Sequence, residues 1–542
     1  MLYLVVSEYL PLWDIFGIVL TITLFENLLL IYLNLVNVNK KSKFGYRLYI
    51  FCYICLVFII LGMLGMMQGN LLSSITISNS FLGGYALNHL SYFGILSFGI
   101  ILVVIDFLTR KNPEFWGRET RRNGSKYIKI LRLKEIGKKI IIITTWIGLC
   151  IGAFCAFITL FGVFEFVTTQ IAVFSSQYGI FLSFIFLANT IILIKIKRGK
   201  WNRKKFRRVA LTGILISISL LSPFIVSNFN AINAEVNFSE AFGQNWQQKI
   251  PVVTNEYFLQ TSFSTAGYYL GTPPKDCNVI ENVLFYDNES IKLYFDVYMP
   301  LKRGEGLPGQ NSTLIRIHGG AWVSGDKGGS NMAQMNKYFA AQGYIVFDIQ
   351  YGLYDSPIAV LDINTPDYNK GDFNIDDMIR HIGEFTKYLS EKARIFGANL
   401  NSVFISGSSS GGHLASAAGL ALASGNYSNL FSQNITIKGI IPFYPSNGQM
   451  VYFGIDGKEE FTNPEKLIES KSPPCLIFQG THDVLNYFGI SRNFRATYLA
   501  KGNVNCAIIW MLLGGHTSDF YFSGYYNQIF LYYMERFMYL HQ

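Results

Sequence analysis

The sequence lacks the cysteine and histidine patterns that mark disulfide-rich and metal-binding proteins. It has seven cysteines, of which four lie in apolar runs before residue 156, where a cysteine usually acts as a small buried hydrophobe. The other three, Cys277, Cys475 and Cys506, cannot all pair with one another, although the last two could face each other on adjacent strands. His, Cys and carboxylate residues do not occur at metal-ligand spacing. We therefore predict neither a disulfide framework nor a resident metal or organic cofactor.

Lysine and arginine are missing from long parts of the first half. They are absent before the first long apolar run, and also from the loops after the second and fourth runs. The first run is too long for a cleavable signal peptide and has no basic residue before it. Each run reaches the length of about 20 residues that a bilayer span needs. The six runs cover residues 15–37, 48–67, 91–109, 140–163, 172–194 and 209–227.

The basic residues that are present gather in the other three loops. Residues 1–228 hold 24 Lys/Arg and 8 Asp/Glu, a net charge of +16, whereas the remainder carries −6 of the total of +10. Basic loops that alternate with uncharged ones indicate membrane topology and contact with lipid headgroups, and they argue against nucleic acid as a partner. By the positive-inside rule the N-terminus and everything after the sixth span lie outside the cytoplasm. We predict a multi-pass integral membrane protein, located in the plasma membrane.

Two carboxylic acids, Glu26 and Asp106, lie inside predicted spans. An intramembrane carboxyl is costly and is a functional candidate, although a hydrogen bond between helices explains it equally well. The six-span half, residues 1–228, is followed by an aromatic and polar linker over 229–280. A catalytic domain then occupies 281–542.

The centre of the second half is the stretch Val403–Leu414, which reads VFISGSSSGGHL. A short apolar strand runs into Gly-x-Ser-x-Gly, with Ser409 at its middle, and a helix rich in small residues follows. This context predicts a nucleophile elbow, in which Ser409 sits on a strained turn at the top of a sheet. The N–H groups at the start of the helix point at the oxygen that becomes negative in acyl transfer.

The partners of a serine nucleophile follow in a defined order. The strand 314–317 ends in the His-Gly-Gly-Ala-Trp loop, His318–Trp322, whose backbone N–H groups can form half of an oxyanion hole. Downstream, Asp483 and His516 each come just after a predicted strand. Ser, Asp and His in this order, all past the carboxyl ends of strands, predict a catalytic triad.

Strands and helices alternate along this half. The segments 283–286 and 293–299 form a predicted hairpin, and helices are predicted at 332–342 and 376–395. Further strands are predicted at 344–349, 403–405, 437–443, 475–478 and 506–513. This pattern indicates an α/β fold whose mostly parallel sheet has an antiparallel N-terminal edge.

Residues from about 280 to 542 resemble the α/β-hydrolase superfamily, specifically its H-G-G-x-W carboxylesterase/lipase branch near hormone-sensitive-lipase-like and feruloyl-esterase-like enzymes. The motifs that carry the resemblance are Asp296–Pro300, the His318 loop, Tyr351–Leu353, the Ser409 elbow and the two triad loops. Ser408 and Gly352 depart from the branch, which often has an acidic residue and an arginine at these places. Residues 1–228 resemble no family known to us.

The resemblance implies a role for each site residue. Ser409 would attack, His516 would act as the general base, and Asp483 would orient His516. The oxyanion would be held by backbone N–H groups of Ser410 and of Gly319, Gly320 and Ala321, above all the last two. The loop would be supported by His318 and Trp322. His482 is the rival base, and His413 is interpreted as a packing or hydrogen-bonding residue.

The sequence thus predicts a membrane-tethered serine carboxylesterase acting on a small-molecule or lipid ester of small or medium acyl length. An amidase, a peptidase or an acyltransferase would use the same triad. The third hypothesis is a non-catalytic receptor or adhesion domain on a hydrolase scaffold, but such a domain usually loses a triad member, and here all three are present. The fourth hypothesis is that the six-span half is a transporter with the hydrolase as an accessory domain, and only Glu26 and Asp106 support it.

Protease treatment tests the predicted topology. Nine basic residues precede the sixth span and none follows it until Lys249, which favours full crossing. Protease added to intact cells or sealed right-side-out vesicles should therefore release a fragment of residues 229–542. Digestion of this half only after membrane rupture would reverse the predicted side.

Overall fold

The computed structural model describes the chain from Gly124 onward with short gaps, together with a few helical positions between residues 29 and 61. The predicted spans at 15–37, 48–67 and 91–109, with Glu26 and Asp106, otherwise lie outside the described residues. The described ranges are 124–162, 166–197, 200–270, 276–288, 291–329, 332–356 and 365–542. The chain divides into two compact units, with boundaries near residues 162, 170, 226 and 269–271.

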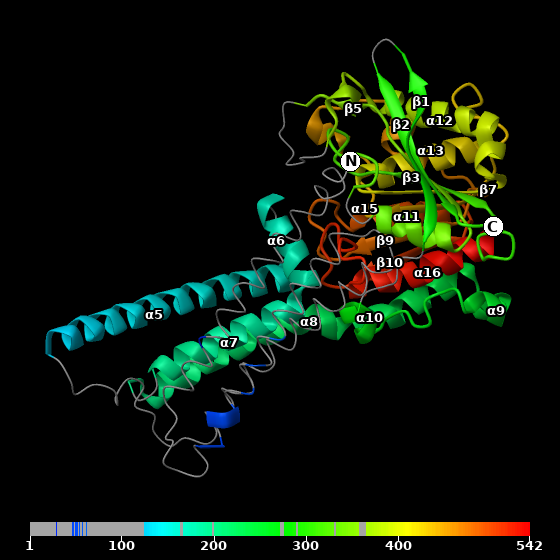
Figure 1. The fold of residues 1–542 in the computed structure, drawn as a ribbon. Helices are drawn as coiled ribbons and strands as arrows, with labels where there is room; N and C mark the ends of the chain where they lie inside the picture. Colours follow the sequence, from blue (N-terminus) through cyan, green and yellow to red (C-terminus); the bar gives the residue numbers. More distant parts are fainter. Residues whose placement is uncertain are drawn as a thin grey trace. The chain divides into compact units, whose positions relative to one another are not determined.

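Three described helices are long and apolar enough to cross a membrane (Figure 1). Their mean hydropathy reaches 2.2 to 2.3 over the most apolar window. They are α5 (Gly124–Phe161), α7 (Gly179–Lys197) and α8 (Arg203–Phe242). The apolar run at 172–194 is divided between α7 and a preceding helix, α6 (Phe166–Gln177).

Small residues let these helices approach one another closely. A Cβ on Gly179 would lie 2.1 Å from the carbonyl oxygen of Leu220, and one on Gly213 would lie 2.1 Å from the Thr190 hydroxyl. Asn189 also donates a hydrogen bond across the helices to the carbonyl of Thr145, at 2.8 Å. Close backbone approach and polar cross-links of this kind are typical of helix packing in membranes.

The second unit contains an eight-stranded sheet in the order β1-β2-β4-β3-β7-β8-β9-β10. The pairs β1–β2 and β2–β4 are antiparallel, and every later pair in the sheet is parallel, which confirms the predicted sheet. The strands are β1 (Cys277–Asp287), β2 (Lys292–Pro300), β3 (Ser312–Ile317), β4 (Ile345–Ile349), β7 (Asn399–Ser408), β8 (Ile437–Phe443), β9 (Cys475–Gly480) and β10 (Cys506–Met511). A separate small sheet pairs β5 (Leu353–Tyr354) with β6 (Lys370–Gly371).

Helices cover both faces of this sheet. Successive side chains of a strand point to opposite faces of the sheet. Those on one face pack against α12 (Ile375–Phe396), α13 (Ser410–Ser424) and α15 (Gly489–Ala500). The opposite set meets α11 (Met332–Ala341) and α16 (Tyr525–His541). The predicted helices at 332–342 and 376–395 correspond to α11 and α12.

Local sequence explains the ends of α12. The side chain of Asn374 accepts a hydrogen bond from the backbone of Asp377, whose carboxylate in turn accepts from the backbone of Asn374. This reciprocal pair is a capping box, which satisfies N–H groups that a helix start leaves open. At the other end Gly397 adopts φ 71°, a left-handed conformation that glycine tolerates best.

The stretch 229–280, which the sequence presents as a linker without strong periodicity, starts inside a helix. α8 continues to Phe242, and the short helices η1 (Trp246–Lys249), α9 (Val252–Asn255) and α10 (Thr265–Leu270) follow. The C-terminal part of α8 lies beside α16 (Figure 1), where Phe238 meets Tyr533 at 5.1 Å between ring centroids. Tyr533 also donates a hydrogen bond to Glu235 at 3.1 Å.

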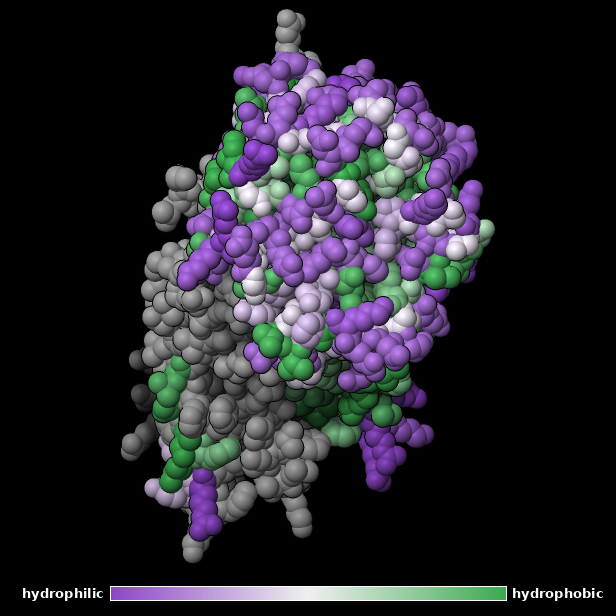
Figure 2. Space-filling view, turned by 90° about the vertical axis from the view of Figure 1, so that its right-hand side faces the viewer, coloured by the Kyte–Doolittle hydropathy of each residue, from purple (hydrophilic) through white to green (hydrophobic). Residues whose placement is uncertain are grey.

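The described surface of Figure 2 is mostly hydrophilic in its upper part, at the height of β1, β2 and α12 in Figure 1. Most apolar side chains of β2 and α12 are instead buried in the core between the sheet and its helices. Burial of apolar area of this kind is the main stabilising contribution to such a unit.

Phe238 offers a test of how much the end of α8 stabilises the second unit. Its side chain is fully buried against Phe242, Trp246 and Tyr533. Phe238→Ala should therefore lower the free energy of unfolding by about 3–5 kcal/mol, as measured by thermal unfolding of the full chain in detergent. Val236→Ala is the matched control, since Val236 is 50% exposed on the same helix and should cost under about 0.5 kcal/mol. Equal losses in both variants would contradict this role.

Candidate active site

Ser409 lies in a sharp turn between β7 and α13. Its backbone adopts φ 55° and ψ −119°, a strained conformation for a residue with a side chain. A Cβ on Gly407 would lie 2.3 Å from the carbonyl oxygen of Gly411, and one on Gly411 would lie 2.3 Å from that of His318. The glycines are therefore required by close backbone contacts, and the predicted strand, turn and helix are all present.

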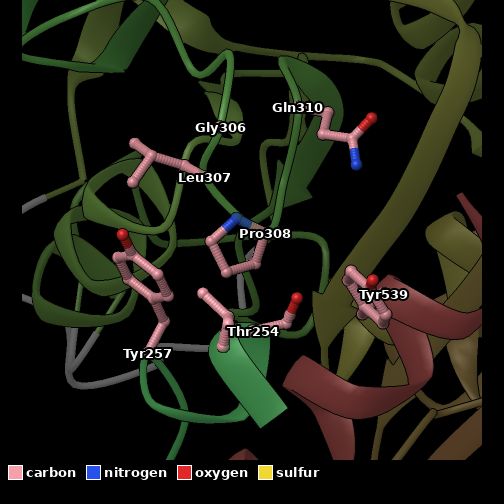
Figure 3. Close-up of a pocket in the computed structure, with 8 residues that line it drawn as sticks. Thr254, Tyr257, Gly306, Leu307, Pro308, Gln310 and Tyr539 are labelled. Atoms are coloured by element: carbon pink, nitrogen blue, oxygen red, sulfur yellow. The ribbon is translucent and has the colours of Figure 1, made fainter. Parts of the chain in front are cut away.

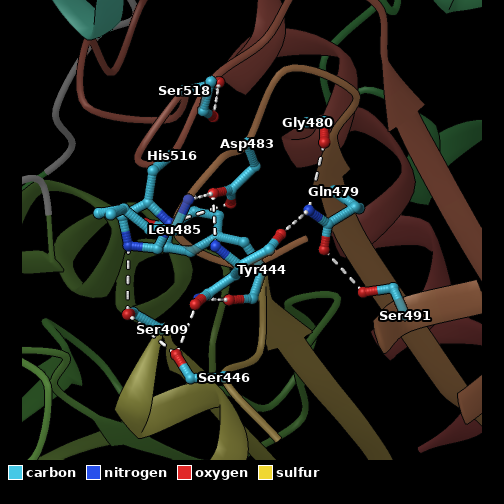
Figure 4. Close-up of polar contacts among 12 residues, drawn as sticks. Ser409, Tyr444, Ser446, Gln479, Gly480, Asp483, Leu485, Ser491, His516 and Ser518 are labelled. Atoms are coloured by element: carbon cyan, nitrogen blue, oxygen red, sulfur yellow. Dashed lines mark hydrogen bonds and ion pairs between the residues drawn. The ribbon is translucent and has the colours of Figure 1, made fainter. Parts of the chain in front are cut away.

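The structure brings Ser409, His516 and Asp483 together in one chain of hydrogen bonds (Figure 4). Nε2 of His516 lies 3.2 Å from Oγ of Ser409, and Nδ1 of His516 lies 2.9 Å from Oδ2 of Asp483. Asp483 follows β9 and His516 follows β10, so neighbouring parallel strands deliver them to the same edge of the sheet.

Asp483 is held firmly. Its side chain is buried, and its other carboxylate oxygen accepts hydrogen bonds from the backbone N–H groups of Leu485 at 3.1 Å and Asn486 at 2.8 Å. His516 is also buried, and its ring packs edge-on against Tyr444 at 4.6 Å. The imidazole therefore has a fixed orientation between the carboxylate and the serine.

The loop after β3 passes directly beside the elbow. A Cβ on Gly319 would lie 3.4 Å from Cβ of Ser409. The next three residues, Gly320, Ala321 and Trp322, all have positive φ, at 127°, 56° and 63°. Such strain in consecutive residues is typical of a backbone held in shape for a functional purpose. Ser410, the first residue of α13, directly follows Ser409 in the chain.

Aromatic contacts support the loop after β3. The ring of His318 stacks on Tyr351 with centroids 4.4 Å apart, and the Tyr351 hydroxyl donates to the carbonyl of His318 at 3.1 Å. Trp322 is buried, and its indole N–H donates to Nδ1 of His413 at 3.2 Å. Both residues predicted to support the loop, His318 and Trp322, therefore make contacts outside it.

The histidines outside the triad have other contacts. Nε2 of His413 faces the carbonyl of Phe461 at 2.8 Å, so this nitrogen carries the proton and Nδ1 accepts from Trp322. Burial lowers the pKa of His413 to about 4, which keeps the ring neutral. The ring of His482 contacts the hydroxyl of Thr481, at 3.1 Å.

A buried cluster of charges lies next to the loop after β3. Lys327 pairs with Asp296 at 3.0 Å, and both side chains are less than 10% exposed. Oδ2 of Asp348 accepts from the backbone N–H of Gly328 at 2.8 Å and from Asn336 at 2.9 Å. Burial first, and then the nearby Asp296 carboxylate, raise the pKa of Asp348 to about 7. These contacts fix the chain segment that follows Trp322.

Sequence reasoning missed two residues at the centre of the site. Ser446, which no predicted motif includes, is buried and lies 3.2 Å from Oγ of Ser409. Asn486 is buried as well, and it donates to Ser446 at 2.8 Å. Both residues follow the carboxyl ends of parallel strands, as Asp483 and His516 do, but no motif distinguishes them from ordinary turn residues.

A small pocket of about 110 Å³ lies elsewhere in this unit (Figure 3). Thr254, Tyr257, Leu307, Pro308 and Tyr539 are among its lining residues. The turn that contributes Leu307 and Pro308 precedes β3, so the pocket lies toward the amino end of that strand, opposite the triad. We assign it no catalytic role.

Comparison with known proteins finds a family match and several similar structures. Residues 295–454 match the family model BD-FAE, which describes an α/β-hydrolase family. An inhibited esterase B from Lactobacillus rhamnosis is similar in structure, at 20% identity and a TM-score of 0.37, over 46% of this chain and 81% of that one. Thermogutta terrifontis esterase 2 phosphonylated by cyclosarin has 19% identity and a TM-score of 0.35, over 46% and 87%. No curated protein is significantly similar in sequence.

The sheet order, the turn at Ser409 and the family match define the class of this half of the chain. Residues 277–542 have the α/β-hydrolase fold, and residues 295–454 within them match an α/β-hydrolase family. The predicted resemblance to the α/β-hydrolase superfamily is confirmed for this half.

The pKa of Asp348 predicts a pH-dependent effect on stability. The unfolded chain loses this proton near pH 4 and the folded protein near pH 7, so ionisation costs stability progressively between these values and by a constant amount above them. Asp348→Asn keeps an acceptor oxygen for Gly328 and Asn336 but cannot ionise. Its stability relative to the wild type should rise from pH 4 to pH 7, by about 4 kcal/mol for a shift of about three pKa units, and then level off. Thermal unfolding across this range measures the difference, and a difference that does not change with pH would contradict the assignment.

Proposed function

We propose that this protein is a membrane-tethered serine hydrolase that cleaves carboxylic esters of small or medium acyl length, with its catalytic unit outside the cytoplasm. The observation that carries the proposal is the continuous hydrogen-bond chain from Ser409 through His516 to Asp483. A serine hydroxyl is a poor nucleophile until a base removes its proton, and this arrangement supplies the base and holds it in place.

In the first half of the reaction Oγ of Ser409 attacks the ester carbonyl while Nε2 of His516 takes its proton. Asp483 stabilises the imidazolium that forms. The bond to the leaving alcohol then breaks, and His516 gives its proton to the departing oxygen. Water repeats the sequence on the acyl-enzyme, releasing the acid and restoring the Ser409 hydroxyl.

The negative oxygen of each tetrahedral intermediate requires donors that are already in place. We assign this role to the backbone N–H of Ser410 and to those of Gly320 and Ala321, with Gly319 allowing the loop to approach the nucleophile. Removing one such donor typically costs about 3–4 kcal/mol in the transition state. Apart from the substrate and water, the mechanism uses side chains and N–H groups of the chain itself.

Membrane attachment is supported by three described helices that are long and apolar enough to cross a bilayer. The side of the membrane rests on the distribution of charge. Nine basic residues lie between Lys195 and Arg208, directly before the last apolar stretch. Lysine and arginine of this density mark cytoplasmic loops, so a full crossing takes the hydrolase unit to the other side.

Labelling with a fluorophosphonate tests the nucleophile. These reagents react with a serine only when a neighbouring base activates it, so the wild type should be labelled and Ser409→Ala should not. Ser408→Ala is the matched control, because it removes the adjacent hydroxyl and leaves Ser409 in place. Equal labelling of Ser409→Ala and the wild type would refute the assignment.

The base is tested with the same reagent and with ester turnover. His516→Ala should reduce kcat by several orders of magnitude, as loss of a triad base does, whereas His482→Ala should have a far smaller effect. If His482→Ala were inactive and His516→Ala kept its activity, the assignment of His516 as the base would be wrong.

A further inference from the structure

Ser446 lies directly against the proposed nucleophile. It follows β8, it is 3% exposed, and its Oγ is 3.2 Å from Oγ of Ser409 (Figure 4). Its backbone N–H also donates to the carbonyl of Ser409, at 3.3 Å. Two hydroxyl groups at this distance share one hydrogen bond, and the direction of that bond decides what Ser446 can do.

Asn486 fixes the direction on one side. Its side-chain nitrogen contacts both the backbone carbonyl of Tyr444 and Oγ of Ser446, the latter at 2.8 Å. A carbonyl oxygen can only accept, so the amide must present its NH₂ group at this end. One hydrogen of that group goes to Tyr444 and the other to Ser446. Ser446 is therefore the acceptor in its bond with Asn486, and its own hydrogen is free to be donated to Ser409.

His516 fixes the direction on the other side. Its Nδ1 faces the Asp483 carboxylate, so Nδ1 carries the proton and Nε2 has a free lone pair. Ser409 donates its hydrogen to that lone pair. Oγ of Ser409 then has only lone pairs left for Ser446, so it is the acceptor in the bond between the two hydroxyl groups.

We propose that Ser446 is a further catalytic residue, which donates a hydrogen bond to the reacting oxygen of Ser409; this inference rests on the proposed hydrolase function. The donors run in one direction, from Asn486 to Ser446, to Ser409, to His516 and to Asp483. The backbone N–H of Asn486 donates to Asp483 at 2.8 Å and closes the ring.

The two halves of the reaction use this bond differently. During acylation the Ser409 O–H bond breaks, its proton passes to His516, and a lone pair of Oγ forms the new bond to carbon. The donor from Ser446 is already present in the free enzyme and competes for the attacking oxygen, so it contributes mainly by aiming the Ser409 hydrogen at His516.

During deacylation the water oxygen bonds to the acyl carbon and gives its proton to His516. The bond between that carbon and Oγ of Ser409 then breaks, and His516 returns the proton to Oγ. An ester oxygen accepts hydrogen bonds weakly, but the departing Oγ gains negative charge. The bond from Ser446 therefore strengthens on the way to this transition state, which is the condition for accelerating a step.

Rapid-mixing kinetics with p-nitrophenyl butyrate separate the two steps, because acylation releases nitrophenolate in a burst and deacylation sets the later rate. Ser446→Ala should lower the deacylation rate constant by about 10- to 100-fold, the range for a hydrogen bond to a charged group, and acylation by much less. Ser446→Thr keeps the hydroxyl and should restore deacylation. Ser446→Cys keeps the shape with a weak donor, and should behave like Ser446→Ala even if the alanine variant folds poorly.

The outcomes separate this inference from the proposed function. Wild-type deacylation rates in Ser446→Cys or Ser446→Ala would overturn the role of Ser446. So would an equal loss in acylation and deacylation, which indicates a structural effect alone. In either case fluorophosphonate labelling of Ser409 would persist and the proposed function would stand. Failure of the wild type to be labelled would instead refute the proposed function.

Discussion

The site depends on the close approach of three backbone segments around Ser409. The turn carrying Ser409, the start of α13 and the loop after β3 lie so near one another that a Cβ on Gly407 or Gly411 would collide with a carbonyl group. Because the strands beneath are parallel, their carboxyl ends bring Ser409, Asp483 and His516 to one edge. The strain at Ser409 is maintained by this packing, since a free chain would relax it.

The parts of this arrangement that sequence could predict are those with local signals. A strand followed by Gly-x-Ser-x-Gly and a helix defines a turn within a dozen residues, and Asp483 and His516 each follow an apolar strand. Ser446 and Asn486 have no such signal, because a serine or an asparagine after a strand resembles any turn residue. Their importance follows only from where the strands converge in space.

α16 was missed for a different reason. It contains Glu535 and Arg536 side by side, and two successive charges indicate a solvated surface, yet both are buried. Glu535 accepts from Tyr338 at 2.7 Å and from Gln342 at 2.9 Å, and Arg536 donates to the carbonyl of Leu259 at 2.9 Å. These partners lie about 200 or more residues away in the chain, so periodicity within the segment could not reveal that the charges are compensated.

The position of α16 in the sequence has a consequence for synthesis of the protein. Phe530 packs on Phe443 of β8 at 4.6 Å and on Phe478 of β9 at 5.0 Å, so α16 covers the aromatic face of the central strands. Every strand of the sheet precedes α16 in the chain. While a ribosome makes the protein, that face and the end of α8 remain uncovered until translation has passed residue 541. A chaperone that shields exposed aromatic surface would have its longest opportunity to bind during this interval.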